Sequence, residues 1–356
     1  MIDELAAEGL RRAKLFKFFW DHEFDTPIRT ELPFRRRLDC WRHGFLSQSG
    51  VLYDLDAHGT DEYLNDVQYL DQWQVNREAQ VFTDHKLAFR ELLQHTHEEQ
   101  LPALHGVLRN GRASDGRGTV LDTDLARWLR ERARTEDRLV CKPEDGSGGH
   151  GVFLVSDDEG SVTTNGKSGV EPVLEAVSDG TVYLAVEYVR QAEYAATLYP
   201  HSVNTVRILT LWDYERDEPY VADAVHRIGT DDSRPVDNWS RGGLSAVVDL
   251  DTGTLGRATR YPDTATLEWF EEHPDTGAPI DGVGIQAWES IATGVREMAD
   301  RFWYVPMIAW DVVSTGGGFE IIEANARPGV ETLQVHRPLL RDDRTRRFFE
   351  HHGVLS

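Results

Sequence analysis

Alternating apolar and polar positions near the C-terminus predict a β-hairpin. Two β-rich runs, IAWDVV and FEIIEAN, flank the polar, glycine-rich segment STGGG within residues 308–334. Glycines supply turn conformations that other residues resist. With the turn centred on Gly317, Asp311 lies directly opposite Glu323, because each is six residues from the centre. Side chains on one face of a strand recur every second residue, so Asn325 joins these two carboxylates on that face.

The pattern from residue 138 onward predicts more strands than helices. Strands are predicted for DRLVCKP, GVFLVSDDEG, TVYLAVEYV, SVNTVRILTLWD and PYVADAVHRIGT, and a second hairpin for RGGLSAVVDLDTGTLGRATRY. Helices are predicted for EPVLEAVSDG, for GIQAWESIATGVREMADRF and for the tail RPLLRDDRTRRFFEHHG. Strands and helices that mix without regular βαβ alternation indicate an α+β fold rather than a doubly wound sheet.

Residues 1–75 have a mainly helical and aromatic pattern. Their start, MIDELAAEGLRRAKLFKFFWDHEF, is amphipathic and lacks a signal-peptide core. We expect its aromatic face to pack on the protein, with a membrane surface as the alternative. Further on, FTDHKLAFRELLQHT predicts a helix with Thr83 or Asp84 as its N-cap. A short strand in LPALHGVLRNG and a capped helix in LDTDLARWLRERA follow.

Charge excludes some classes of partner. The chain carries a formal net charge of −23 at pH 7, and its 38 basic residues include only five Lys. Nucleic acids and anionic membranes both need a basic footprint, so neither is expected as a partner. The acidic balance fits a cytosol of high salt, and it equally fits an ordinary acidic enzyme from a GC-rich genome.

Cysteine content and hydropathy favour the cytoplasm. Two cysteines, Cys40 and Cys141, lie far apart in the sequence, which implies no disulfide framework and fits a reducing compartment. No apolar run reaches the about 18 residues of a membrane span. We therefore expect a cytoplasmic protein.

The predicted hairpin gathers oxygen ligands on one face. Asp311, Glu323 and Asn325 bring two carboxylates and an amide oxygen together, with few local cations other than Arg327. Like charges directly opposed destabilise a hairpin, and a bound divalent cation would relieve that repulsion. Ligand sets made of oxygen alone favour Mg²⁺ over zinc or copper.

A glycine loop follows the strand that ends at Lys142. The segment GSGGHG comprises Gly146, Ser147, Gly148, Gly149, His150 and Gly151. A strand, a glycine loop and a second strand can lay backbone N–H groups over a polyphosphate, because glycine lets the backbone approach closely. The alternative is a flexible turn. The loop matches neither a Walker motif nor a dinucleotide-binding turn, but a lysine beside it could neutralise phosphate oxygens.

These motifs together resemble the ATP-grasp superfamily, and most closely its sugar-transfer-associated and α-L-glutamate-ligase-like members. The resemblance rests on CKPEDGSGGHGVFLV, SVNTVRILTL, NWSRGGLSAVVDLDTG, HPDTG and WDVVSTGGGFEIIEANARPG. It implies two α+β lobes that clamp ATP under a glycine-rich flap. The implied divisions are a helical N-terminal region (1–75), the first part of the ATP-grasp region (76–136), a lid lobe with the flap (137–200) and a C-terminal catalytic lobe (201–356).

The resemblance also implies how the nucleotide is bound. Lys142 matches the lysine that contacts the phosphates and the adenine edge, and Lys86 an earlier phosphate-binding lysine. The alternative for Lys86 is an exposed helix lysine. Glu187 matches the acid that accepts from the adenine amino group, with backbone groups of Tyr188 and Val189 beside the base. The remaining nucleotide contacts are the flap (Gly146, Ser147, Gly148, Gly149, His150) and, for the ribose hydroxyls, Glu193.

The residues expected at the transferred phosphate are Arg207, Arg227 and Asn238, and Arg327 matches a basic residue that faces the phosphate or the acceptor. Arg207 would face the γ-phosphate or the incoming carboxylate, and Arg227 with Asn238 resembles a ligase segment that holds the transferred phosphate and metal. For each arginine alone, the alternative is a surface ion pair. The metal ligands implied by the resemblance are Asp311, Glu323 and Asn325, holding two Mg²⁺ ions with Mn²⁺ as a substitute.

The resemblance implies a carbon–nitrogen ligase. ATP would convert a carboxylate into an acyl phosphate, which an amine then attacks, and polysaccharide or glycoconjugate modification is one setting for such a reaction. The alternatives are an ATP-grasp phosphotransferase acting on a hydroxyl, such as that of a sugar, and a nucleotide-binding accessory module of a glycosyltransferase system. The expected partners are ATP, a carboxylate and an amine or sugar acceptor, and a homodimer is the common assembly of such chains.

Overall fold

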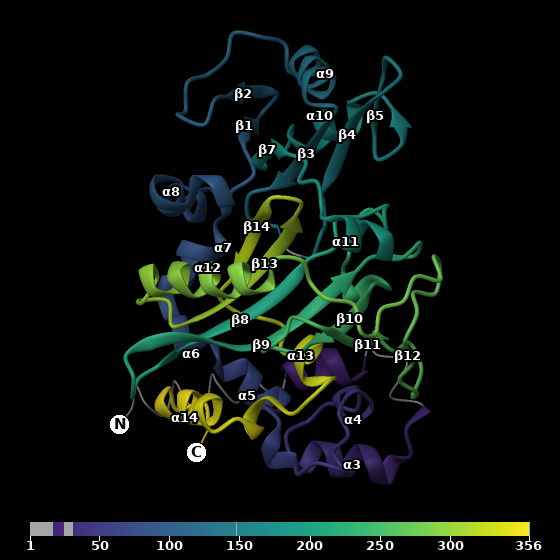
Figure 1. Ribbon diagram of the computed structural model, residues 1–356, viewed down its shortest axis with the longest axis vertical. Coiled ribbons are helices and arrows are strands. Elements are labelled where there is room, and N and C mark those ends of the chain that lie inside the picture. Colours follow the sequence, from purple (N-terminus) through teal and green to yellow (C-terminus); the bar gives the residue numbers. More distant parts are fainter. Residues whose placement is uncertain (1–16, 25–30, 147, 356) are drawn as a thin grey trace.

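Two antiparallel sheets organise the chain in the computed structural model, which describes residues 17–24, 31–146 and 148–355. Over these residues each sheet has seven strands, in the orders β2-β1-β7-β3-β4-β5-β6 and β12-β11-β10-β9-β8-β13-β14. The first sheet forms a small lobe, and the second forms the body of a larger lobe below it (Figure 1). Helices and antiparallel strands mix as predicted, so the α+β class is confirmed.

The small lobe is built from residues 104–187. Its strands are β1 (Leu104–Arg109), β2 (Arg112–Ser114), β3 (Arg138–Pro143), β4 (Phe153–Asp158), β5 (Ser161–Thr164), β6 (Lys167–Ser168) and β7 (Tyr183–Glu187). Helices α9 (Leu125–Glu136) and α10 (Glu171–Ala176) cover one face, where Leu129, Leu139 and Val155 are fully buried. The expected division at residues 136 and 137 therefore falls inside this lobe, because β1, β2 and α9 pack with the strands that follow.

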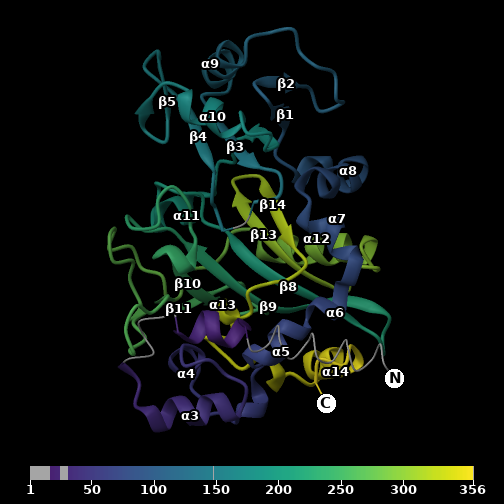
Figure 2. The same cartoon turned by 180° about the vertical axis from the view of Figure 1, so that it is seen from behind.

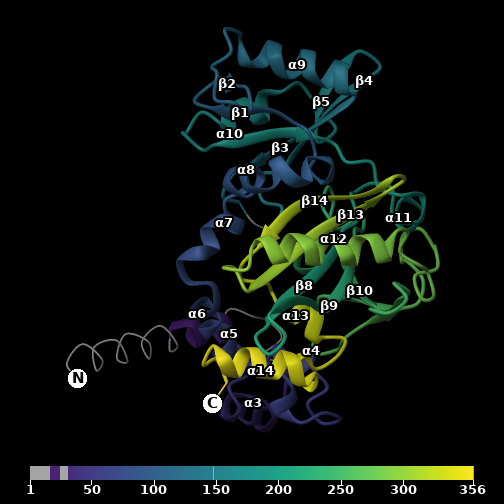
Figure 3. The same ribbon diagram turned by 60° about the vertical axis from the view of Figure 1, so that its left-hand side comes forward.

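The large lobe is a sheet with helices on both faces. Its strands are β8 (Val206–Asp213), β9 (Glu218–Ile228), β10 (Leu244–Val248), β11 (Leu255–Arg260), β12 (Trp269–Phe270), β13 (Met307–Thr315) and β14 (Gly318–Asn325). Helix α12 (Trp288–Arg301) lies along one face, and α13 (Glu331–Gln334) and α14 (Asp343–His351) lie on the other (Figure 3). The short helix α11 (Glu193–Leu198) connects the two lobes. The predicted strands from residue 202 onward and the two helices are all present.

The N-terminal region is helical, as predicted. It contains α3 (Phe34–Arg42), α4 (Ser49–Leu52), α5 (Asp66–Asp71) and α6 (Trp73–Asn76), which lie at the base of the large lobe beside α13 and α14 (Figure 2). Residues 17–24 are also helical, and the buried Glu23 carboxylate of this helix accepts hydrogen bonds from the Ser47 backbone and hydroxyl. The rest of the amphipathic start lies outside the described residues. No described helix is long and apolar enough to cross a membrane.

The predicted helix around Lys86 is broken at His85. The chain forms α7 (Val81–Asp84) and then α8 (Lys86–His97), and the N-cap of α8 is His85, whose Nδ1 accepts from the Ala88 N–H at 3.4 Å. The predicted caps Thr83 and Asp84 were therefore wrong. Asp84 instead accepts from the backbone N–H of Ala326 at 2.8 Å, just past the end of β14, so its carboxylate is not free to cap a helix.

The β13–β14 hairpin has the predicted pairing, but for a different local reason. Thr315 pairs with Gly318, so the turn is the two-residue Gly316–Gly317 and is not centred on Gly317 alone. A β-bulge between the pairs Val312–Ile321 and Asp311–Glu323 then shifts the register by one residue. The shift brings Asp311 opposite Glu323 and leaves Ile322 without a strand partner.

Asn76 joins the N-terminal region to this hairpin. Its buried amide donates to the carbonyl oxygens of Met307 at 2.6 Å and Ala326 at 2.8 Å, and accepts from the Met307 N–H at 3.2 Å. Because each buried peptide group left without a partner costs about 1–3 kcal/mol, Asn76→Ala should destabilise the protein by about 2–4 kcal/mol in urea unfolding. Asn65→Ala, which removes the cap of α5 and one exposed hydrogen bond to the His43 carbonyl, should cost about 1 kcal/mol. Equal losses for the two variants would contradict this role.

Candidate active site

A cavity of about 380 Å³ lies between the two sheets. Strands β3, β4 and β7 of the small lobe line one wall, and β8, β9 and β14 of the large lobe line the other. Almost all of the predicted site residues line it: Lys86, Lys142, Gly146, Gly148, Gly149, His150, Glu187, Tyr188, Val189, Arg207, Arg227, Asn238, Glu323, Asn325 and Arg327. Ser147 was also predicted here, but it lies outside the described residues.

One part of the cavity wall is apolar. Val140, Leu154 and Val186 from the small lobe face it together with Ile322 of β14. The strand end at Glu187–Val189 forms the adjoining edge, where a Glu187 carboxylate oxygen accepts from the Ala103 N–H at 3.3 Å. An apolar wall beside a strand end can accommodate a heteroaromatic base. The placement of adenine at this edge stays a prediction.

Lys142 is buried in the cavity wall. Its Nζ donates to the carbonyl oxygen of Ile322 at 2.7 Å, the residue that the β-bulge leaves without a strand partner. Burial lowers the pKa of Lys142 to about 8, although the charge of Glu323 raises it. The Lys142 ammonium therefore remains charged in most molecules at neutral pH, and it lies beside the hairpin.

Lys86 is not an exposed helix lysine. Its side chain is buried, and Nζ lies 3.2 Å from Glu323 and donates to the carbonyl oxygen of Gly146 at 2.5 Å. One cation thus contacts both the glycine loop and the hairpin. The phosphate-binding role that the resemblance implies for Lys86 stays a prediction.

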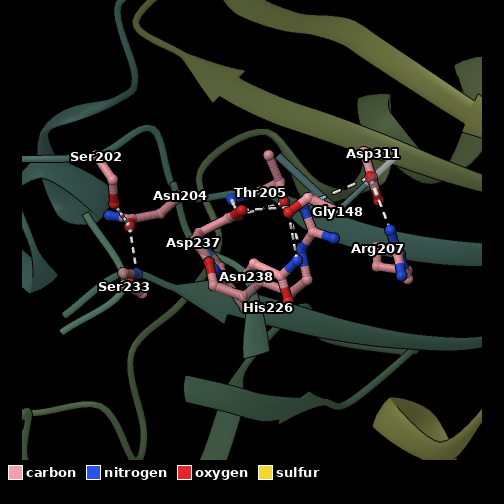
Figure 4. A network of polar contacts seen from close by, with 12 residues as sticks. Gly148, Ser202, Asn204, Thr205, Arg207, His226, Ser233, Asp237, Asn238 and Asp311 are labelled. Atoms are coloured by element: carbon pink, nitrogen blue, oxygen red, sulfur yellow. Dashed lines mark hydrogen bonds and ion pairs between the residues drawn. The ribbon is translucent and has the colours of Figure 1, made fainter. Parts of the chain in front are cut away.

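Arg207 and Asp311 form a buried bidentate ion pair. The guanidinium Nε and Nη2 each lie 2.8 Å from one Asp311 oxygen, because β8 and β13 pair with these two residues opposite each other (Figure 4). Burial alone would raise the pKa of Asp311, but Arg207 and Arg227 outweigh it and hold that pKa below its usual value.

This pair corrects two expectations. The hairpin is not poor in cations, since Lys86, Lys142 and Arg207 all approach its carboxylates. Asp311 also does not line the cavity, and both of its oxygens are already bound by Arg207. The directly opposed carboxylates are thus compensated by basic side chains, and Asp311 is not available as a metal ligand in this arrangement.

Arg227 is held by two residues that the sequence did not identify. Its Nε donates to the Thr205 hydroxyl at 3.0 Å, and its Nη2 donates to Asp237 at 2.9 Å and lies 3.5 Å from Asp311. Asp237 also accepts from the Thr205 N–H at 2.8 Å. Figure 4 shows this network between β8 and the loop that carries Asn238. Asp237 and Thr205 therefore orient Arg227 toward the cavity.

Glu323 and Asn325 provide the oxygen atoms that face the cavity from β14. Within the described part of the chain, no three His, Cys, Asp or Glu side chains form a group that could hold a metal ion. The Asn325 side-chain nitrogen is buried without a hydrogen-bond partner there. A carboxylate and an amide oxygen suit Mg²⁺, which keeps several waters and takes phosphate oxygens as further ligands. Glu323 and Asn325 thus fit a magnesium site without Asp311.

The glycine loop approaches the large lobe at the rim of the cavity. The Asn238 side-chain amide donates to the carbonyl oxygen of Gly148 at 2.8 Å. Gly149 has a φ of +72°, and a Cβ there would lie 2.9 Å from both Cγ atoms of Val236. The described part of the loop is therefore a close-fitting flap, and only glycine permits this approach.

This sequence matches the model of the sugar-transfer associated ATP-grasp family over residues 65–344. The chain belongs to that family. No curated protein matches it.

Solved structures similar to this ATP-grasp chain are distant. A biotin carboxylase complex from Campylobacter jejuni has 12% identity, covers 87% of this chain and 52% of its own, and gives a TM-score of 0.43. A D-alanine–D-alanine ligase from Bacillus anthracis in complex with ATP has 12% identity, covers 76% of this chain and 67% of its own, and gives 0.36. An N5-carboxyaminoimidazole ribonucleotide synthetase in complex with ADP has 12% identity, covers 72% of this chain and 48% of its own, and gives 0.39. The chain thus spans about half the length of the synthetase.

Glu193 is the predicted ATP-site residue that the structure does not bring to the cavity. Strand β7 ends at Glu187, and the chain then pairs with the end of β13 through Gln191 and Thr315 before α11, whose first residue is Glu193. Its side chain is exposed and does not line the cavity. The assignment of Glu193 to the ribose hydroxyls is therefore wrong in this arrangement.

The flap geometry gives a test with a matched control. Gly149→Ala should weaken ATP binding about 10-fold, since a Cβ there would push the flap away from Val236. Gly166 has nearly the same φ, +74°, and no heavy atom lies within 4 Å of the position that its Cβ would take, so Gly166→Ala carries the same backbone strain without the contact. Titration calorimetry with ATP and Mg²⁺ would compare the variants. Equal ATP affinities would show that the close approach does not matter.

Proposed function

We propose that this protein is an ATP- and Mg²⁺-dependent ligase that activates a carboxylate as an acyl phosphate and joins it to an amine. The observation that carries the proposal is the convergence of five basic side chains on a cavity that also has an apolar wall. These side chains are Lys86, Lys142, Arg207, Arg227 and Arg327. Two oxygen ligands, Glu323 and Asn325, share that cavity.

The positive charges of these side chains would neutralise the negative charge on the phosphoryl oxygens during phosphoryl transfer. Catalysis of this transfer depends on positioning and on neutralising the phosphoryl oxygens, without a covalent intermediate on the protein. Lys142 and Lys86 would hold phosphates from the side of the small lobe and α8. Arg227, oriented by Asp237, would hold the transferred group from the large lobe. The attack by the substrate carboxylate is thereby guided to one position.

The flap and the metal ligands complete the proposed chemistry. Glu323 and Asn325 would hold Mg²⁺, which supplies charge neutralisation on the phosphoryl oxygens when it is bound. The described flap residues, linked to the large lobe through Asn238, would exclude water that otherwise hydrolyses an acyl phosphate. The amine then reacts with the acyl carbon and orthophosphate leaves.

Orthophosphate release from ATP tests this function. Release that requires both a carboxylate and an amine, together with trapping of the acyl phosphate by hydroxylamine, is the expected result. A phosphorylated product that resists hydroxylamine would instead identify a phosphotransferase acting on a hydroxyl. ATP binding without turnover for any substrate pair would favour an accessory binding module.

A further inference from the structure

A fourth carboxyl side chain, Glu331, lines the cavity besides Glu187, Asp237 and Glu323, and the chemistry described so far gives it no role. It begins the short helix α13, beyond the end of β14 that carries Asn325. Its Oε1 would lie 2.9 Å from a Cβ on Gly329, so the carboxylate lies against the backbone two residues past Arg327. Trp239, Ser240 and Thr332 also line the cavity.

The Glu331 carboxylate has no compensating cation among the residues that the structure describes. Glu323 is paired with Lys86, and Asp237 with Arg227, but no basic side chain lies within ion-pairing distance of Glu331. Burial raises the pKa of Glu331, while its own backbone N–H and the more distant charge of Arg207 lower it. A desolvated acid that faces a cavity without a partner is costly unless a ligand compensates it.

The charge of Glu331 acts on a group of buried side chains around it. Burial raises the pKa of the tyrosines Tyr53, Tyr69 and Tyr261, and the charge of Glu331 raises each of them further. Burial also raises the pKa of Asp66 to about 6, and Glu331 contributes to that rise. Burial lowers the effective dielectric constant around Glu331, and this increases its attraction to a positive ligand group. This end of the cavity therefore favours a cation.

Arg327 offers the complementary charge nearby. It lines the cavity, its side chain is exposed, and it has no ion-pair partner within the described ranges. Its positive charge lowers the pKa of Tyr69, whereas Glu331 raises it, so both groups act on one hydroxyl. An unpaired cation and an unpaired anion thus face the same space.

We propose that Glu331 binds an ammonium group and Arg327 an anionic group of one small substrate, an amino carboxylate. The proposal rests on the ligase function above and names the class of its amine substrate. Glu331 holds the nitrogen, and Arg327 holds the carboxylate that marks the other end of the molecule. Such a pair recognises both charges and rejects neutral hydroxyl analogues, because the desolvated acid would be left without its partner.

Matched pairs of probes test the assignment without turnover. Each pair consists of two carboxylates of equal length, one with an ammonium group and one with a hydroxyl group at the other end. The pairs are glycine and glycolate, β-alanine and 3-hydroxypropionate, and 4-aminobutyrate and 4-hydroxybutyrate. Their affinities would be measured by calorimetry for the full chain with ADP and Mg²⁺. In at least one pair, the amino member should bind about 10-fold more tightly.

Two variants separate the two ends of the substrate. Glu331→Gln should abolish the preference for the amino member and leave ATP affinity unchanged, whereas Arg327→Gln should weaken both members of a pair equally. Glu320→Gln is the matched control, because Glu320 is a partly buried carboxyl on β14 that does not line the cavity. The control should keep the preference.

Two results would overturn the proposal: equal affinities within all three pairs, or a preference that survives in Glu331→Gln. Thermal unfolding of each variant would show that it folds. A different result would contradict the proposed ligase function alone. If the amino members bind through Glu331 but no combination of carboxylate and amine releases orthophosphate from ATP, the amino-carboxylate site stands and the proposed reaction does not.

Discussion

Replacing Glu323 by alanine is expected to reduce Mg²⁺-dependent turnover of ATP by about 10²–10³-fold while the fold is retained. Glu323 is the only carboxylate that reaches the cavity from the described β14 strand, and it also lies 3.2 Å from Lys86. The substitution removes the strongest proposed metal ligand and releases a phosphate-binding lysine from its partner. Orthophosphate release as a function of Mg²⁺ concentration measures the effect.

A control on the same strand makes the Glu323 result specific. Glu320→Ala changes a carboxyl three residues earlier, where burial, with the nearby charge of Glu187, raises the pKa to about 7. Glu320 does not line the cavity, so its removal should leave turnover within a few-fold of the parent. Near-normal turnover in Glu323→Ala, or an equal loss in both variants, would remove Glu323 from the metal site.

The hairpin shows how far local sequence patterns predicted this site. Alternation and the glycine-rich turn predicted the pairing of Asp311 with Glu323, but the actual turn is Gly316–Gly317, and the pairing arises only because a bulge shifts the register by one residue. The bulge at Ile322 was not predictable, because nothing in the local pattern distinguishes it from a regular strand residue. It forms within the packed lobe, and it leaves the Ile322 carbonyl free to accept from Lys142, far away in the sequence.

Charge compensation at the site depends on contacts between distant segments. The pairing of β8 with β13 places Arg207 opposite Asp311, although 104 residues separate them. The alternation in SVNTVRILTL shows which face Arg207 shares with its neighbours, but not which strand lies beside it. The sequence could therefore identify Arg207 as important, but it assigned the guanidinium to a ligand instead of to Asp311.

Two functional candidates were missed for different reasons. Asp237 orients Arg227, and only its position directly before the predicted Asn238 could have indicated it. Glu331 had a clearer signal, since it is a single acid within the apolar segment PGVETLQV. A lone charge in such a segment is a reason to expect a buried partner or a ligand.

Arg207→Met is expected to destabilise the protein by about 3–5 kcal/mol at pH 7, because it leaves Asp311 buried without its bidentate partner. The value should lie near the lower limit, since Arg227 remains 3.5 Å from Asp311. Adding Asp311→Asn should restore most of the stability. Arg127→Met, which breaks an exposed pair with Glu131, should leave the unfolding midpoint unchanged. Urea unfolding measures all of these variants.

The pH dependence of this loss distinguishes an unpaired charge from a packing defect. In the parent, the low pKa of Asp311 contributes stability above the pKa of the unfolded chain, about 3.9, and that stability is lost as pH falls through the folded value. Without Arg207, burial should raise the pKa of Asp311, so the carboxyl can take a proton as pH falls from 7 to 5. The destabilisation should therefore shrink over this range. A loss that stays constant from pH 7 to pH 5 would show that Arg207 acts through packing, and not through the charge of Asp311.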